Sequence, residues 1–147
     1  GWFEEQVSPD WLVCRQKMMS LLQDEAKLDE IVQMVGMDAL SAGDRLKMEA
    51  ARSIREDYLH QNSFHEIDTY TSLQKQFYLM KLVMAYYEES LEALNEGASI
   101  RDLIMMNVRE RIGRYKYTPE DAIEEEYNKV YGELQDEIAS LSRKGDE

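Results

Sequence analysis

The sequence predicts an all-α protein, a bundle of about six helices in a single domain covering residues 1–147. Residues that favour helices are plentiful, whereas the 147 residues include only two prolines and seven glycines. Apolar residues recur every three or four positions, and no segment alternates as a strand would. The length suits one domain with its own core and is too short to suggest two.

The first helix is predicted to start in the segment "SPDW", with Ser8 as the N-cap and Pro9 at the first helical position. A weak break over residues 23–25 is expected to separate it from a second, short helix, which Gly36 ends. The inward positions expected in these two helices are Trp11, Cys14, Met18, Leu21, Leu22, Leu28, Ile31, Val32 and Val35.

A third helix is predicted to begin at Ser41, because "SAGD" resembles a capping box with Asp44 in the third helical position. It runs to about Tyr58, and a long helix follows over about 71–94. Ser99 is expected to cap a fifth helix. The predicted inward positions of these helices include Leu46, Ala50, Ile54, Phe77, Met80, Met84, Leu91, Leu103 and Ile112.

The last helix is predicted to start in "TPED", with Thr118 as the N-cap and Pro119 next to it. The preceding "RYKY" places Tyr115 and Tyr117 at a junction expected to be exposed. One face of this helix is apolar, with Ile123, Tyr127, Val130, Leu134, Ile138 and Leu141. Its other face is acidic, with Glu124, Glu125, Glu126, Glu133, Asp136 and Glu137.

The formal net charge of −13 disfavours nucleic acid and anionic membrane surfaces as partners. A basic protein surface would suit better, although solubility alone explains many acidic surfaces. Cys14, the only cysteine, cannot form an internal disulfide and is expected to be a buried thiol in the reducing cytoplasm. No run of eighteen apolar residues occurs, so direct membrane insertion is not expected. The chain opens on Gly1 rather than Met and is expected to be a piece of a longer protein.

The sequence offers no catalytic group or metal site of its own. A glycine-rich phosphate loop is missing, and the zinc-protease pattern that begins at His65 has Thr69 where its second histidine would stand. Asp57 and His60 have the spacing of half a di-iron site, but no matching pair occurs. Cys14 lies on an apolar helix face, which indicates packing rather than a nucleophile.

The segment "REDYLHQNSFHEIDTY" over residues 55–70 allows two interpretations. Phe64 could close the end of the bundle while Asp68 or Thr69 caps the next helix. Alternatively, Phe64 and Tyr58 could form an aromatic platform for a planar base. The pattern alone favours the first interpretation without excluding the second.

Most of residues 2–90 resemble a known family, and the resemblance becomes looser in the last two helices. "GWF", "SPDWLVCRQKMMS", the stretch from "LLQDEAKLDEIVQMVGMDALSAGD" to "SFHEIDTY", and "SLQKQFYLMKLV" follow one another in the family's order almost without gaps. Together they resemble the C-terminal helical domain of the catalytic A subunit, or alpha chain, of V-type/A-type ATP synthases. The resemblance implies that the phosphate loop, the catalytic glutamate and the magnesium ligands lie upstream of this chain.

The resemblance also implies two contact sites. In the related beta subunit of F-type ATP synthases, an acidic helix-turn-helix loop faces the rotating central stalk, and "DALSAGD" with the next residue matches it. The matched positions are Asp38, Ala39, Leu40, Ser41, Ala42, Gly43, Asp44 and Arg45. Three of these are alanine or glycine where the F-type loop is acidic, which favours contact by shape over contact by charge. Phe64 and Tyr58 match the aromatic residues with which the family closes over the adenine ring.

The function implied is that of the C-terminal part of the catalytic subunit, which couples ATP hydrolysis or synthesis to transport of H+ or Na+. ATP/ADP with Mg2+ would be held by the full-length subunit and not by this piece alone, which is not expected to be active. The implied partners are the B subunit of the alternating ring and the central stalk subunits. The expected location is cytoplasmic, peripheral to the membrane through the complex. The alternative is a free-standing acidic helical adaptor or regulatory protein that docks a basic partner through its last helix.

Overall fold

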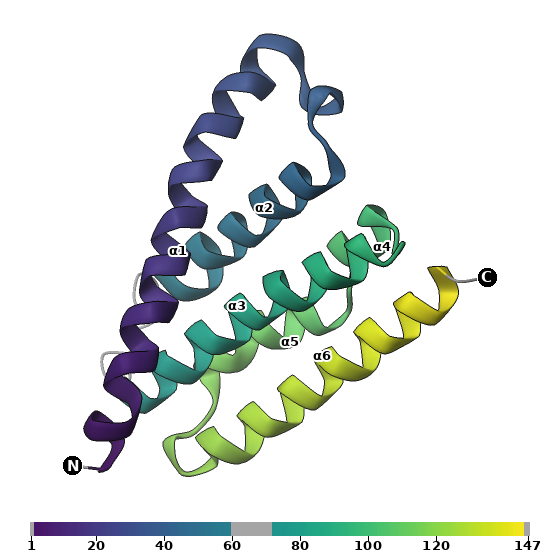
Figure 1. Ribbon diagram of the computed structural model, residues 1–147. Helices are drawn as coiled ribbons and strands as arrows, with labels where there is room; N and C mark the ends of the chain where they lie inside the picture. Colours follow the sequence, from purple (N-terminus) through teal and green to yellow (C-terminus); the bar gives the residue numbers. More distant parts are fainter. Residues whose placement is uncertain (1, 60–71, 146–147) are drawn as a thin grey trace.

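The computed structural model describes the backbone of residues 2–59 and 72–145 and the side chains of residues 9–59 and 72–142. Every regular element in these ranges is helical, which confirms the predicted all-α class (Figure 1). The α-helices in these ranges are α1 (Trp2–Val35), α2 (Ala42–Ser53), α3 (Leu73–Asn95), α4 (Ile100–Ile104), α5 (Val108–Arg114) and α6 (Ile123–Gly145). Short helical turns join them: the 3-10 turns η1 (Met37–Ala39), η4 (Tyr115–Tyr117) and η5 (Glu120–Ala122), and the π-helical turn η2 (Ile54–Leu59).

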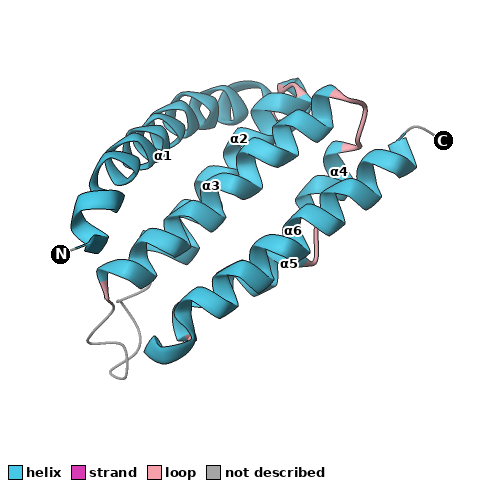
Figure 2. Cartoon of the chain, turned by 60° about the horizontal axis from the view of Figure 1, so that its bottom comes forward, coloured by secondary structure: helices cyan, strands magenta, loops and turns pink. Residues whose placement is uncertain are grey.

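Helix α3 lies at the centre of the bundle. It packs against α1 and α2 on one side and α6 on the other, with α4 and α5 also in contact (Figure 2). Its apolar stripe supplies much of the core, and the inward positions predicted in α2, α3 and α6 are largely confirmed. The fully buried core side chains include Leu46, Ile54, Leu79, Met80, Leu82, Val83, Tyr86, Leu103, Ile123, Val130 and Leu134.

Helix α1 is longer than the sequence predicted: its predicted start and the predicted break are wrong, and only its end at Gly36 is confirmed. It runs from Trp2 through Pro9, so Ser8 is not its N-cap. Pro9 has no N–H to donate to the preceding turn, yet the backbone is helical on both sides of it. The break expected over residues 23–25 is also absent, because Glu25 faces inward and both of its oxygens accept hydrogen bonds from Arg55, at 3.0 and 2.7 Å.

The predicted fifth helix is two helices, α4 and α5. Glu137 of α6 explains the interruption, because its carboxylate accepts the backbone N–H groups of Asn107 and Val108, both at 2.9 Å. These are N–H groups that a new helix start leaves unsatisfied, so a distant side chain stabilises the start of α5. Ser99 does precede α4, but its side chain makes no capping hydrogen bond.

The start of α6 and the surroundings of Tyr115 also differ from the prediction. Pro119 has a non-helical ψ of 147°, and the 3-10 turn η5 follows it, so α6 begins at Ile123 rather than at the predicted "TPED" cap. Tyr115 is 1% exposed, and its hydroxyl donates to the Ile123 carbonyl at 2.8 Å. This buried hydrogen bond fixes the junction, while Tyr117 remains exposed as predicted.

The acidic face of α6 is partly used within the domain. Arg111 of α5 pairs with Glu126 and Glu133 at 3.0 and 3.1 Å. Together with the capping role of Glu137, this engages three of the six predicted acidic residues internally. The surface left for a basic partner is therefore smaller than the sequence indicated.

Candidate functional site

The turn between α1 and α2 contains the predicted contact loop and is shaped by Gly36. The Gly36 N–H donates to the Val32 carbonyl at 2.8 Å and ends α1. Its φ of +92° is in a region that residues with a Cβ rarely adopt, so glycine is required there. Because α1 has 34 residues, this turn lies about 50 Å from the start of the helix. Figure 1 shows α1 and α2 diverging toward the turn, which forms the far end of the domain.

The predicted contact residues 38–45 do not all face solvent. Asp38 and Ala39 are exposed on η1, whereas Leu40 is only 9% exposed and packs inward. Ser41 caps α2 as predicted, since its Oγ accepts the Asp44 N–H at 3.1 Å. Residues 42–45 form the first turn of α2 and are half-buried. The contact itself stays a prediction, and Asp38 and Ala39 present the most accessible part of this loop.

Four large apolar side chains stand exposed beside this loop, and the sequence analysis did not assign them to the site. We call Ile31, Met34, Val35 and Met37 the apolar tip; they are 43%, 82%, 65% and 46% exposed. Ile31 and Val35 have helical spacing and were expected to face inward, but the divergence of α1 and α2 leaves them uncovered. Clustered exposed apolar residues at the end of an otherwise highly charged protein are typical of a protein contact.

Acidic residues predominate in the sequence around the apolar tip. Residues 28–44 contain Asp29, Glu30, Asp38 and Asp44 and no basic residue, while Lys27 and Arg45 stand just outside this stretch. A partner that complements this surface would present an apolar patch bordered by basic side chains. The sequence showed the acids, but only the structure shows that the apolar side chains in the same stretch are uncovered.

Tyr58, one of the two predicted adenine contacts, lies at the other end of α2. It belongs to η2, is half-buried and packs against the core. Burial raises its pKa, and Arg15 and Cys14 of α1 lie near it. The eighteen residues from Ala42 to Leu59 separate it from the apolar tip by roughly 25 Å. Phe64, the other predicted contact, lies outside the described residues, so the pairing of the two rings stays a prediction.

One arginine joins the helix that follows the contact loop to the rest of the bundle. Arg109 of α5 donates to the Glu49 carboxylate and the Ser53 hydroxyl of α2, at 2.9 and 2.8 Å. It also donates to the Ile104 carbonyl at 2.8 Å, and its guanidinium lies 4.7 Å from the centre of the Tyr86 ring. These contacts connect α2, α3, α4 and α5 around a side chain that is 14% exposed. These contacts hold the four helices together, so the bundle should resist deformation when a force acts at the apolar tip.

The described side chains do not suggest a metal centre. Among them, no group of three or more histidine, cysteine, aspartate or glutamate residues is placed to hold a metal ion. His60 and His65 lie outside the described residues. In the same part of the chain, no helix is both long enough and apolar enough to span a bilayer.

Comparison with known proteins identifies the family. A protein-family model described as the C-terminal domain of V and A type ATP synthase matches residues 1–104. The chain belongs to this family. Membership confirms the resemblance drawn from the sequence and does not favour the free-standing adaptor.

Curated members of the V and A type family extend the similarity to nearly the whole chain, including the last helices, where the sequence resemblance looked looser. The V-type ATP synthase alpha chain of Acetivibrio thermocellus is 52% identical over 143 residues, which are 97% of this chain and 24% of the relative. That of Clostridium botulinum strain Okra is 50% identical over 144 residues, or 98% and 24%. That of Clostridioides difficile is 47% identical over 143 residues, or 97% and 24%. This chain spans about a quarter of the length of these relatives.

Proposed function

We propose that this domain acts in the catalytic subunit of a rotary V/A-type ATP synthase as the lever that contacts the central stalk. The observation that carries the proposal is the apolar tip, an uncovered cluster at the far end of a cross-braced domain of this family. The relatives are alpha chains of V-type ATP synthases, and their greater length leaves room for a nucleotide-binding domain outside these 147 residues. We place that domain upstream, holding ATP/ADP and Mg2+.

In this proposal, nucleotide binding upstream moves the bundle as a rigid body, and the tip pushes on the stalk. A ligand shifts the equilibrium between two positions of the domain only by its different affinity for them. A bundle that deformed would not carry this movement to the stalk, so the proposal requires the domain to move as a rigid body. The Arg109 contacts and the Arg55–Glu25 pair support this rigidity. ATP turnover, coupled to H+ or Na+ transport, belongs to the assembled ring with the B subunit. The complex would then stand on the cytoplasmic side of the membrane, peripheral to it.

A cross-linking experiment tests the contact. Ala39→Cys places a thiol on the exposed part of the loop, and Asp136→Cys on the exposed face of α6 is the matched control. Both are made with Cys14→Ser in the assembled complex and labelled with a maleimide that carries a benzophenone, which on irradiation inserts into C–H bonds of whatever protein touches it. We expect Ala39→Cys to cross-link to a central stalk subunit in at least one nucleotide state, and Asp136→Cys to give none. Absence of the Ala39 product in every nucleotide state would sink the proposal.

The chemistry of the contact is tested by charge. Met34→Glu changes a side chain that is 82% exposed, so folding should be unaffected, whereas an apolar contact would lose its burial and gain a buried charge. We expect ATP hydrolysis by the complex to continue while ATP-driven ion transport falls several-fold. Gln33→Glu, which adds the same charge at the neighbouring exposed position, is the control. Equal effects of the two variants would show that the apolar tip is not the contact.

The second proposed site is the adenine contact of Tyr58 and Phe64. Stacking on a ring contributes only about 1–3 kcal/mol, so the 147-residue chain alone should bind ATP weakly or not at all and should show no turnover. Titration calorimetry of this chain with ATP checks the first expectation. A sub-micromolar dissociation constant would contradict the placement of the phosphate site elsewhere.

A further inference from the structure

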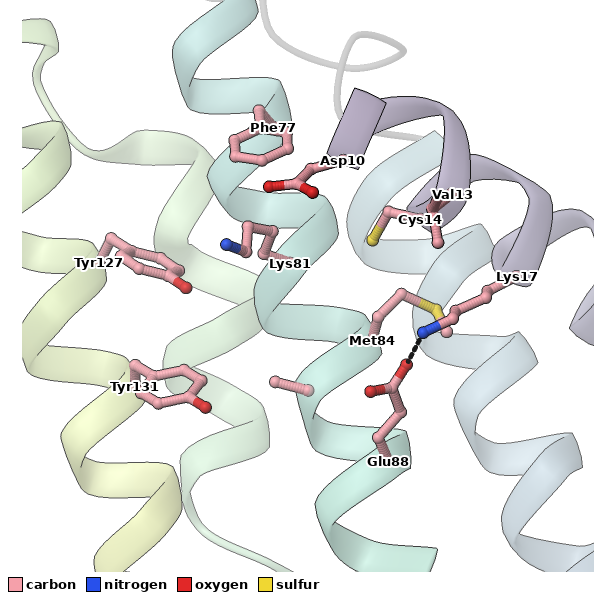
Figure 3. Close-up of a pocket in the computed structure, with 11 residues that line it drawn as sticks. Asp10, Val13, Cys14, Lys17, Phe77, Lys81, Met84, Glu88, Tyr127 and Tyr131 are labelled. Carbon is pink, nitrogen blue, oxygen red and sulfur yellow. Dashed lines mark hydrogen bonds and ion pairs between the residues drawn. The ribbon is translucent and has the colours of Figure 1, made fainter. Parts of the chain in front are cut away.

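A groove between α1, α3 and α6 has features that the lever function does not use. Its volume is about 370 Å3, which is in the range of small-ligand sites. Val13 and Cys14 line it from α1, Phe77 and Met84 from α3, and Tyr127 from α6 (Figure 3). Phe77 and Met84 are each 4% exposed, so the floor of the groove is continuous with the core.

The groove contains a cation without a carboxylate partner. Lys17 also lines it, but its Nζ is paired with Glu88 Oε1 at 3.0 Å. Lys81 takes part in none of the ion pairs found among the described side chains, and its Nζ lies 5.2 Å from the centre of the Phe77 ring. Lys81 is half-buried, so its ammonium is a partly desolvated cation that an added anion could pair with.

Two tyrosines of α6 line the same groove as Lys81. Figure 3 shows the Tyr127 hydroxyl on the side of the groove where the Lys81 ammonium lies, whereas Tyr131 lines the groove one turn further along α6. The Tyr127 ring stacks on Tyr78 at 4.4 Å between centroids, which holds its position. Burial raises the pKa of Tyr127 to about 12, so its hydroxyl stays a hydrogen-bond donor at neutral pH. The Lys81 ammonium and the Tyr127 hydroxyl are therefore two donors on one side of the groove, which suits an anion with acceptor oxygens.

The opposing charges limit what the groove can accept. Asp10 is also in the lining, and Glu88 is neutralised by Lys17, so the groove as a whole is close to neutral. A group with several negative charges would be repelled by Asp10 and by the acidic surface of the chain. A single carboxylate on an apolar body fits both the donors and the apolar floor.

We propose that the groove between α1, α3 and α6 binds a monocarboxylate with an apolar, aromatic-sized body, through Lys81 and the hydroxyl of Tyr127. The body lies on Phe77 and Met84, and the carboxylate accepts hydrogen bonds from these two donors. Such a ligand bridges α1 and α6, both of which pack on α3. This inference does not depend on the contact with the central stalk.

Cys14 provides a reporter, because its side chain lines the groove and is the only thiol of this chain. Burial raises its pKa, so maleimide labelling is followed at about pH 8.5, where more thiolate forms. The full-length subunit is labelled with and without the Cys14→Ser change, and the difference gives the rate at Cys14. Phenylacetate is the probe, and phenylacetamide is its uncharged control of the same shape.

We expect phenylacetate to slow Cys14 labelling at least about three-fold at saturation and phenylacetamide to have little effect. Lys81→Met should raise the phenylacetate concentration for half the effect at least about ten-fold, and Tyr127→Phe about three-fold or more. Lys129→Met, at an exposed position of α6 outside the groove, should leave it within about two-fold. Equal effects of acid and amide, or no protection by either, would overturn the proposal. An unchanged response of Lys81→Met would do the same.

The carboxylate could be free or could belong to a neighbouring protein segment, and a second arm separates these sources. Cys14 labelling is measured in the assembled complex without any probe. Protection that Lys81→Met removes identifies a protein carboxylate in the groove. Labelling as fast as in the free subunit, with protection by added phenylacetate, identifies a free acid. In the complex, protection that Lys81→Met does not change would contradict the proposed donors.

Discussion

Replacing Arg109 with methionine should destabilise the domain by about 2–3 kcal/mol. The substitution keeps an unbranched apolar stem and removes donors to Glu49, Ser53 and Ile104 at 2.8–2.9 Å. Hydrogen bonds that involve a charged group contribute about 1.5–3 kcal/mol each and are not additive. Breaking a fully buried ion pair costs about 3–5 kcal/mol. Glu49 is 24% exposed and keeps Arg52 at 2.8 Å, so the lower part of the combined range applies.

Urea and thermal unfolding of the 147-residue chain, followed by circular dichroism, measure this loss. A change of 2–3 kcal/mol in a chain of this size lowers the melting temperature by roughly 5–10 °C. Arg114→Met is the matched control, because Arg114 is 72% exposed and lies 3.9 Å from an equally exposed Glu110. It should change stability by less than about 0.5 kcal/mol. If Arg109→Met were no more destabilising than Arg114→Met, the cross-brace assigned to Arg109 would be refuted.

Three further predictions concern stability, each measured by urea unfolding. Burial raises the pKa of Asp57 from 3.8 to about 6, so the folded state binds a proton more tightly and the free energy of unfolding falls as pH rises between these values. Asp57→Asn should remove this fall and add about 1–2 kcal/mol of stability at pH 7. A gain that does not depend on pH would contradict this cause. Gly132→Ala, with open space around the new Cβ, should stabilise α6 by about 0.5–1 kcal/mol. Gly113→Ala should give no such gain, because its new Cβ would lie 3.0 Å from Asp57 Oδ1. Ser41→Ala should lower stability by about 1 kcal/mol, because the Ser41 side chain makes a capping hydrogen bond. Ser99→Ala should cost only a few tenths of a kcal/mol, because the Ser99 side chain makes no capping hydrogen bond. Similar losses in the two variants would refute this difference.

Local signals in the sequence predicted the parts of the fold that local physics determines. The cap at Ser41 and the stop at Gly36 depend on residues within one helical turn, and both were predicted correctly. The apolar stripe of α3 was also correct, because one face of a central helix must be buried wherever its neighbours lie.

Boundaries that depend on distant residues could not be predicted in this way. Glu137 stabilises the start of α5 from thirty positions away, so the sequence around Asn107 contains no sign of the break. Likewise, Glu25 looked like a polar interruption in α1 until Arg55 was found beside it. In each case the hydrogen-bond partner of the backbone N–H or carboxylate group lies far along the chain, where local patterns do not reach.

The apolar tip shows why the site was harder to predict than the fold. Periodicity gives the direction of a side chain relative to its own helix but not whether another helix lies in that direction. Ile31 and Val35 follow the same helical spacing as Leu28. Leu28 is 8% exposed, whereas Ile31 and Val35 are 43% and 65% exposed. The difference arises because α1 and α2 move apart toward the turn that joins them. The pattern that builds the core therefore continues, unchanged in the sequence, onto the surface where contact with the central stalk is proposed. Met34, at 82% exposed, adds to the same cluster, and the cluster rather than any one residue is the signal. The resemblance pointed to the loop after Gly36, and the structure adds the apolar end of the helix before it.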